Sequence, residues 1–234
     1  MGFKNGKALV SLRALCIGAI TLLTLADPVH GYTTSVYEDC VRGNNVRKTV
    51  ERELPVFNIL EISGAFKINI RSTQTKQTVK ISGDENILPH IATTTSGNKL
   101  LIHSTKPICT QMGISLDISV GNLYALVSSG SDNVKVHEIY ADRFSLVLEG
   151  AGDIELTGYT RKFDADISGS GDLETRGLKT EETTLNISGT SNANVHAAQI
   201  LTVNIVGVAD VYYTGDPGQV YKDILGAGTL NKIE

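Results

Sequence analysis

The sequence contains no tryptophan, and its 234 residues include only five phenylalanines, five prolines, three cysteines and two methionines. So few prolines, beside 23 glycines, exclude collagen and proline-rich linkers. With 21 basic and 25 acidic side chains the chain is slightly acidic, which argues against a nucleic-acid partner, since such proteins usually carry a basic patch. The hydrophobic fraction is 41% and only one apolar stretch approaches membrane length, so disordered and multi-span membrane proteins are excluded as well.

The one long apolar stretch lies near the amino terminus and is typical of a secretory signal peptide. A basic segment precedes the apolar run at 14–26, which is short for a membrane-spanning helix, and a small-residue cleavage pattern ends at Gly31. We therefore expect residues 1–31 to be a signal peptide. Cleavage after Ala26, or retention as an N-terminal anchor that would be the chain's membrane contact, are the alternatives. The expected location is the periplasm, the outer membrane surface or the extracellular medium.

Removal of the signal peptide would leave two cysteines, Cys40 and Cys109. In an oxidising compartment two cysteines most simply form one disulfide. No histidine has a zinc-like spacing from either cysteine, and a Cys-x-x-Cys redox motif is absent. We expect a bridge that ties the polar segment from Tyr37 to Arg47, within an N-terminal extension at 32–49, to the irregular stretch at 106–113. Two unpaired, buried thiols are the alternative.

A glycine recurs every 18 to 20 residues through the body of the chain. The repeat glycines are Gly130, Gly150, Gly169, Gly189, Gly207 and Gly226. Apolar and polar residues alternate on both sides of each glycine, which indicates short, half-buried strands. A fixed period is typical of a solenoid, because equivalent residues must stack from coil to coil. Residues 50–234 are therefore predicted to form an all-β, right-handed parallel β-solenoid with coils of about 19–20 residues, with a β-sandwich as the alternative.

A small polar residue follows three positions after each repeat glycine. This turn ladder consists of Asn133, Asp153, Asp172, Asn192 and Asp210, with Thr229 in the last coil. Asparagine and aspartate are typical of turns, because their side chains bond nearby backbone and tolerate left-handed conformations. A cation site or a carbohydrate-binding strip is the alternative interpretation. The nonapeptide period of calcium-binding β-rolls is not matched, so no metal and no cofactor is assigned.

The repeated phrase Ser-Gly-x-Gly-Asp-Leu, at 168–173 and in variant form at 150–154, resembles a bacterial family of secreted domains. That family is the auto-transporter adhesin head family, also called the GIN domain family. The likeness covers about residues 50–231. It implies an exported β-helix-like domain with a role in adhesion or surface interaction, and it brings no catalytic motif.

The function expected from the sequence is an exported, non-enzymatic binding or structural module of the bacterial envelope, adhesin-like in character. The alternative is a polysaccharide-active β-helix enzyme, a lyase or a hydrolase, for which Asp153 and Asp172 would supply carboxylates one coil apart. Because both residues are explained as turn residues, no catalytic residue is assigned. The expected partner is an envelope protein or a glycan, and self-association through the coil ends is a further expectation.

Overall fold

The alternation of apolar and polar residues gives strands throughout the part of the chain that the structure describes. The computed structural model describes residues 39–72 and 77–234, which lie in one of two compact units of the chain. These residues contain 17 β-strands, one short 3-10 helix and no α-helix. They form a β-solenoid of about five turns, so the predicted solenoid is confirmed. No helix within these residues is long and apolar enough to cross a membrane. The predicted signal peptide lies outside the described residues.

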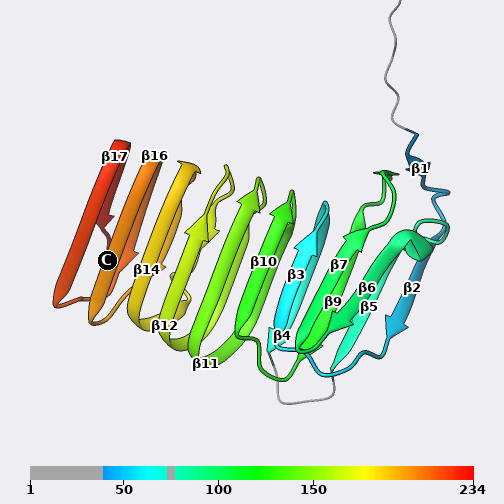
Figure 1. Ribbon diagram of the computed structural model, residues 1–234, viewed down its shortest axis with the longest axis horizontal. Helices are drawn as coiled ribbons and strands as arrows, with labels where there is room; N and C mark the ends of the chain where they lie inside the picture. Colours follow the sequence, from blue (N-terminus) through cyan, green and yellow to red (C-terminus); the bar gives the residue numbers. More distant parts are fainter. Residues whose placement is uncertain (1–38, 73–76) are drawn as a thin grey trace, which may run out of the picture. The chain divides into compact units, whose positions relative to one another are not determined.

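Strands from successive coils pair in two parallel stacks (Figure 1). The first stack contains β7 (Lys99–Ser104), β3 (Ile59–Ser63), β10 (Ala125–Gly130), the later parts of β11 (Asn133–Gly150), β12 (Ile154–Ile167) and β14 (Leu178–Thr190), and the earlier parts of β16 (Ile200–Thr214) and β17 (Gln219–Lys232). The second stack contains β9 (Ile114–Val120), β4 (Phe66–Ser72), the earlier parts of β11 and β12, then β13 (Leu173–Glu174), β15 (Ala193–His196) and the ends of β16 and β17. A short third segment joins the stacks where residues 139–141, 158–160 and 178–180 pair.

The N-terminal end departs from the regular parallel order. The coil of β3 and β4 lies between the coil of β7 and β9 and the coil of β10 and β11, although it comes first in the chain. The strands outside it run antiparallel: β5 (Thr78–Asp84) on β9, β2 (Arg47–Arg52) on β5, and β6 (Ile91–Ser96) on β7. Helix η1 (Leu88–His90) connects β5 to β6. The prediction of parallel pairing throughout is therefore wrong at this end, where Gly97, with φ at 60°, closes a β6–β7 hairpin.

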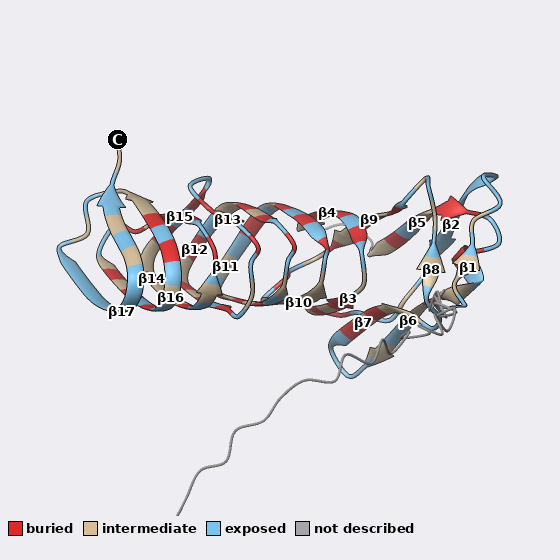
Figure 2. Ribbon diagram, turned by 90° about the horizontal axis from the view of Figure 1, so that it is seen from above, coloured by how far each residue is buried: buried red, intermediate tan, exposed pale blue. Residues whose placement is uncertain are grey.

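Apolar side chains from both stacks fill the space between them. Buried and exposed residues alternate along the strands, so buried positions recur coil after coil (Figure 2). Ile167, Ile187 and Ile205 are register neighbours and are 1–2% exposed. Phe144 and Phe163, which are also buried, form a second column, with ring centroids 6.4 Å apart. The core is thus continuous from coil to coil, as the alternation predicts.

The repeat glycines form one column because the backbones of successive coils approach closely there. A Cβ atom added to Gly189 or Gly207 would lie 2.2 Å from the carbonyl oxygen of the preceding glycine in the column. Real Cβ atoms do not come that close to an oxygen, so any other residue at these positions would force the strands apart. The column begins at Gly64, which lies below Gly130. The steric demand is therefore the physical cause of the period.

Candidate functional site

The disulfide predicted between Cys40 and Cys109 is present, with Cα atoms 5.6 Å apart. It fastens β1 (Val41–Arg42) beside β8 (Ile108–Cys109), and the Gly43 amide donates to the carbonyl of Cys109 at 2.9 Å. Next to it, the buried Asp84 carboxylate accepts hydrogen bonds from the Asn45 amide and from the hydroxyl of Thr110. The bridge is thus part of a polar clip that holds residues 40–45 on the solenoid end.

The turn ladder lies along the edge where the first stack turns into the second. Its side chains accept hydrogen bonds from the backbone of the next coil: Asn133 from the Asp153 amide at 3.4 Å, Asp153 from the Asp172 amide at 3.3 Å, and Asp172 from the Asn192 amide at 3.1 Å. At the last coil Asp210 accepts from the Thr229 hydroxyl at 2.6 Å. These bonds link one coil to the next and do not close a turn on nearby backbone, and none of the ladder residues is among those with a left-handed backbone. Among the described residues no group of three or more histidine, cysteine or acidic side chains is arranged to hold a metal ion.

A groove of about 730 Å³ crosses the outer face of the second stack over β9, β4, β11, β12 and β13. Its polar lining includes Lys67, Asp117, Lys135, Asp153, Glu155 and Asp172. Part of the turn ladder therefore forms one side of the groove, whereas Asn192 and Asp210 are not in its lining. The volume lies in the range of ordinary ligand sites, which hold a few fixed polar groups in a concave surface.

The carboxylates of the groove are held by cations, by backbone amides or, in the case of Asp117, by the side-chain amide of Asn69 at 3.4 Å. Glu155 forms an ion pair with Lys135, and Glu174 accepts hydrogen bonds from the Arg176 side chain at 2.8 and 2.9 Å. Burial alone would raise the pKa of Glu174, but the hydrogen bonds and charge of Arg176 outweigh burial, and the pKa is lowered. A general acid for glycoside cleavage needs the opposite shift.

Asp132 is the carboxyl group whose pKa is raised, and burial is the main cause. Its side chain is fully buried, and it accepts hydrogen bonds from the Phe66 amide at 2.9 Å and the Ser128 hydroxyl at 3.2 Å. These contacts and its burial place it inside the solenoid. No substrate reaches it without unfolding, so its perturbed pKa is a property of the core.

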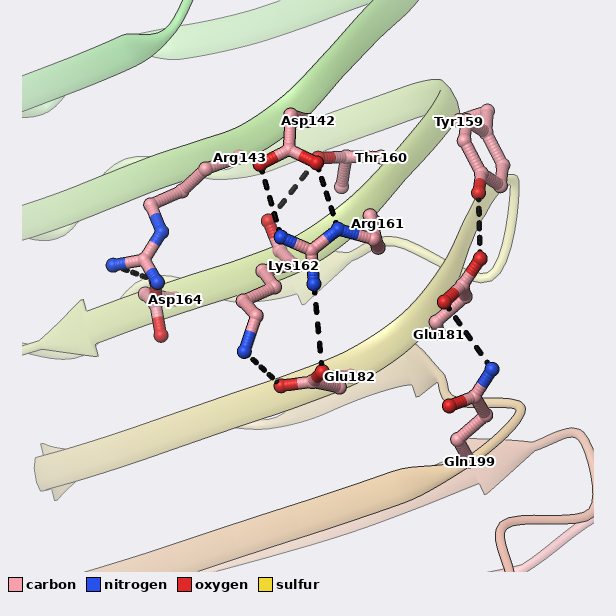
Figure 3. Close-up of polar contacts among 10 residues, drawn as sticks. All are labelled: Asp142, Arg143, Tyr159, Thr160, Arg161, Lys162, Asp164, Glu181, Glu182 and Gln199. Carbon is pink, nitrogen blue, oxygen red and sulfur yellow. Dashed lines mark hydrogen bonds and ion pairs between the residues drawn. The ribbon is translucent and has the colours of Figure 1, made fainter.

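A belt of paired charges runs along the outside of β11, β12 and β14 (Figure 3). Arg161 donates two hydrogen bonds to Asp142, at 2.7 and 3.0 Å, and lies 3.6 Å from Glu182, which also pairs with Lys162. The hydrogen bonds from Arg161 are the main reason why the pKa of Asp142 is lowered. Because the partners occupy equivalent positions in neighbouring coils, the register of the strands sets the whole belt.

Exposed tyrosines flank this belt. Tyr140 and Tyr159 are register neighbours with ring centroids 5.9 Å apart and planes inclined by 36°. The Tyr159 hydroxyl donates to Glu181 at 2.9 Å, and Gln199 donates to the other oxygen of Glu181 at 3.2 Å (Figure 3). A shallow concave site of about 510 Å³, called the tyrosine pocket below, lies next to them. Its lining includes Asn122, Tyr124, Tyr140, Asp142, Arg143 and Ser145.

Sequence reasoning missed both the groove and the tyrosine pocket. The sequence does contain a signal for the tyrosine pocket, because Tyr140 and Tyr159 are 19 residues apart, which is the period of the repeat. In a solenoid that spacing puts two side chains at the same place in adjacent coils.

Comparison with family models matches residues 56–217 to the family described as "Putative auto-transporter adhesin, head GIN domain". A solved structure of a putative adhesin from Bacteroides fragilis is similar, with a TM-score of 0.68 and 18% identity over 82% of this chain and 100% of that one. A putative lipid binding protein from Parabacteroides distasonis has a TM-score of 0.57 and 20% identity over 83% and 99% of the two chains. At these identities the structural likeness shows the fold alone. No curated protein matches the chain.

Proposed function

The chain belongs to the head GIN domain family of auto-transporter adhesins, as its repeats indicate, and we propose that it is an exported, non-enzymatic binding module of the bacterial envelope. The family, and the solved structure of a putative adhesin that this chain resembles, support a binding role. The observation that carries the proposal is the groove over the second stack, whose polar side chains are already fixed by one another.

Pre-arranged polar groups suit binding, because a partner then immobilises few side chains. The strands beneath the groove pair in register over five coils, so most of the lining lies on rigid strands, with Asp153 and Asp172 in the turns along one side. Both signs of charge are present, with Lys67 and Lys135 near a larger set of acidic groups. A partner that carries both donors and acceptors, an envelope protein or a glycan, fits this lining.

Export is supported by the disulfide, because such bridges persist in oxidising compartments and are rare in the cytosol. The periplasm, the outer membrane surface and the extracellular medium all satisfy that condition. The apolar run at 14–26 remains the predicted export signal.

A polysaccharide-active enzyme is the alternative, and it would need a carboxylic acid that donates a proton, a role that neither Glu174 nor Asp132 suits. The pKa of Glu174 is lowered, which is the wrong direction for a proton donor. The pKa of Asp132 is raised, but its side chain is buried in the core. Asp153 and Asp172, the carboxylates suggested by the sequence, accept hydrogen bonds from backbone amides of the next coil. The proposed role is therefore binding without cleavage.

Co-sedimentation of the purified full chain with bacterial outer-membrane fragments tests the proposal. We expect binding that Lys135→Glu weakens by about tenfold or more, because it places an acidic group beside Glu155. Lys106→Glu, the same change of charge at an exposed residue outside the groove, is the matched control and should bind as the wild type does. Protease-treated and periodate-treated fragments distinguish a protein partner from a glycan.

A reducing-sugar assay on the same fragments addresses the enzyme alternative. Release of sugar that depends on Glu174 would replace the binding role with catalysis. No binding to any preparation, or equal binding by Lys135→Glu and the wild type, would contradict the proposal as well.

A further inference from the structure

The tyrosine pocket combines flat aromatic surfaces with side chains that have hydrogen-bonding capacity left over. Tyr140 is 76% exposed and Tyr124 is 44% exposed, although both are large aromatic side chains. The backbone of Tyr124 is fixed, because its amide donates to the Asn58 carbonyl and its carbonyl accepts from the Ser145 amide. Tyr140 lies against Tyr159, whose hydroxyl is fixed by Glu181. The two tyrosines thus stand on fixed backbone while much of their aromatic surface meets solvent.

The polar side chains of the pocket are oriented from behind. Two hydrogen bonds from Arg161 fix Asp142, which is still 73% exposed, so its carboxylate can accept more. Arg143 is 62% exposed and lies 3.6 Å from Asp164, so most of its five donor hydrogens remain available. Asn122 adds an amide that can donate and accept. The pocket therefore offers acceptors and donors at fixed places beside an aromatic face.

The charges of the pocket are balanced locally, because Asp142 is paired with Arg161 and Arg143 with Asp164. A strongly charged ligand would find no excess of the opposite sign. The matching ligand is uncharged, has a ring with a flat C–H face that can lie on tyrosine, and carries several hydroxyl groups at its rim. We propose that the tyrosine pocket is a subsite for one sugar ring of a neutral glycan.

The repeat gives this subsite a direction. Tyr140 and Tyr159 belong to adjacent coils, and their centroids are 5.9 Å apart, comparable to the length of one sugar unit in an extended chain. A glycan that lies along the stacking direction of the strands can therefore place one ring against Tyr140 and the next against Tyr159. Glu181 and Gln199, in the following coils, continue the polar rim in the same direction (Figure 3).

A protein partner is a poorer match for these observations. A stable protein interface covers about 800 Å² on each side and has an apolar centre, whereas this pocket is small and its surroundings are charged. A proline-rich peptide also docks on aromatic grooves, and it is included in the test as a competing ligand class. The inference rests on the proposed binding role and specifies one of its ligand classes.

The test uses the purified full chain and three immobilised neutral hexasaccharides: cellohexaose, chitohexaose and maltohexaose. At least one should bind, and Tyr140→Ala should weaken that binding by about tenfold, since it removes the stacking face. Tyr140→Phe keeps the ring and should bind within about twofold of the wild type. Tyr221→Ala removes another exposed tyrosine, far along the solenoid on β17, and is the matched control. Because the chain has no tryptophan, a change in tyrosine emission on binding gives a second readout.

Each outcome separates this inference from the proposed function. If the chain binds outer-membrane fragments and none of the hexasaccharides, the sugar subsite is wrong and the envelope-binding role stands. If it binds neither, both fail. Binding of decaproline in place of the sugars, or sugar binding that Tyr140→Ala leaves unchanged, would also overturn the subsite. Tyr140→Ala should remain folded, because substitution of so exposed a side chain changes stability little.

Discussion

Asp132 shows how a single residue departs from the repeat for a structural reason. It occupies the position that Gly152 and Gly171 hold in the next two coils. The stacking is direct: a Cβ atom added to Gly152 would meet the backbone of Asp132, and one added to Gly171 would meet the backbone of Gly152. Below Asp132 lies the displaced coil of β3 and β4, whose Phe66 amide needs an acceptor and finds the Asp132 carboxylate at 2.9 Å. The departure thus marks the point where the regular repeat meets the irregular end.

Asp132 should make stability fall as the pH rises. Burial raises its pKa in the folded protein above the unfolded value of 3.8, so the native state holds the proton more tightly. Its contribution is fully present below the unfolded pKa and is lost as the pH rises through the folded pKa. Asp132→Asn keeps an acceptor for the Phe66 amide and cannot ionise, so its unfolding free energy should lack this decline. Urea unfolding of both proteins between about pH 3 and pH 7 measures the difference, and parallel curves would contradict it.

Asp132→Ala separates the hydrogen bond from the charge. It leaves the Phe66 amide buried without its acceptor, which should cost about 1–3 kcal/mol relative to Asp132→Asn at every pH in the series, because neither variant ionises at this position. A difference between the two variants that changes with pH would mean that a group other than Asp132 titrates, and equal stabilities would show that the hydrogen bond contributes nothing.

At the scale of the strand, the glycine column should be the least tolerant feature of the solenoid. Gly207 has φ at 138°, and an added Cβ would lie 2.2 Å from the Gly189 carbonyl oxygen, so Gly207→Ala must push β16 away from β14. We expect a loss of about 3 kcal/mol or more, at the upper end for single substitutions. Gly218→Ala is the control, because its Cβ would meet nothing closer than 4.0 Å and should change stability by about 0.5 kcal/mol or less. Thermal and urea unfolding of the two variants would show equal losses if the close approach were unimportant.

The last strand, β17, has an open edge that Lys222 interrupts. Lys222 is the register partner of Val203, so a charged residue stands where the other coils place an apolar one. Val220 and Leu225 nearby are 41% and 64% exposed. Charged residues that point inward at a sheet edge are a recognised protection against pairing with another chain. Self-association through the coil ends remains a prediction, and Lys222 is the residue that would limit it.

Lys222→Val should therefore raise self-association. The substitution continues the apolar column to the edge and removes the charge, so a second chain meets an uninterrupted strand. Sedimentation velocity over a range of concentrations should show an association constant at least about tenfold higher than for the wild type. Lys106→Val, at an exposed residue outside the strands, is the control. Unchanged association of Lys222→Val would show that Lys222 does not protect the edge.

Across the whole solenoid, the features that can be predicted from the sequence are those that depend on residues close together in the chain or on the fixed period. From Leu126 onward each coil repeats the same steric requirement, so the glycine period and the alternation predict the strands and the turn ladder. The N-terminal end is set by pairings between residues far apart in the chain, such as Arg47 with Asp84, and no period announces them. The Gly97-Asn98 turn was the one local signal there. The groove and the tyrosine pocket depend on which outward side chains coincide across coils, which emerges only when the register is known.

The disulfide stabilises the N-terminal end of the solenoid, whereas β17 at the other end has an open edge. Cys40 and Cys109 close a span of 69 residues, for which the chain-entropy estimate is about 4 kcal/mol as an upper figure. Each coil contacts mainly its neighbours, so the loss of the bridge should loosen the end and fade along the stack. The double variant Cys40→Ser/Cys109→Ser should lose about 2–4 kcal/mol in urea unfolding.

Hydrogen exchange in the same variant should rise first in β1, β8 and the Asn45 amide on Asp84, and should stay unchanged in β14 and β16. The reduced wild-type protein is the control for the substitutions themselves. A uniform rise in exchange from β10 to β17 would show instead that the clip stabilises the solenoid as one cooperative unit.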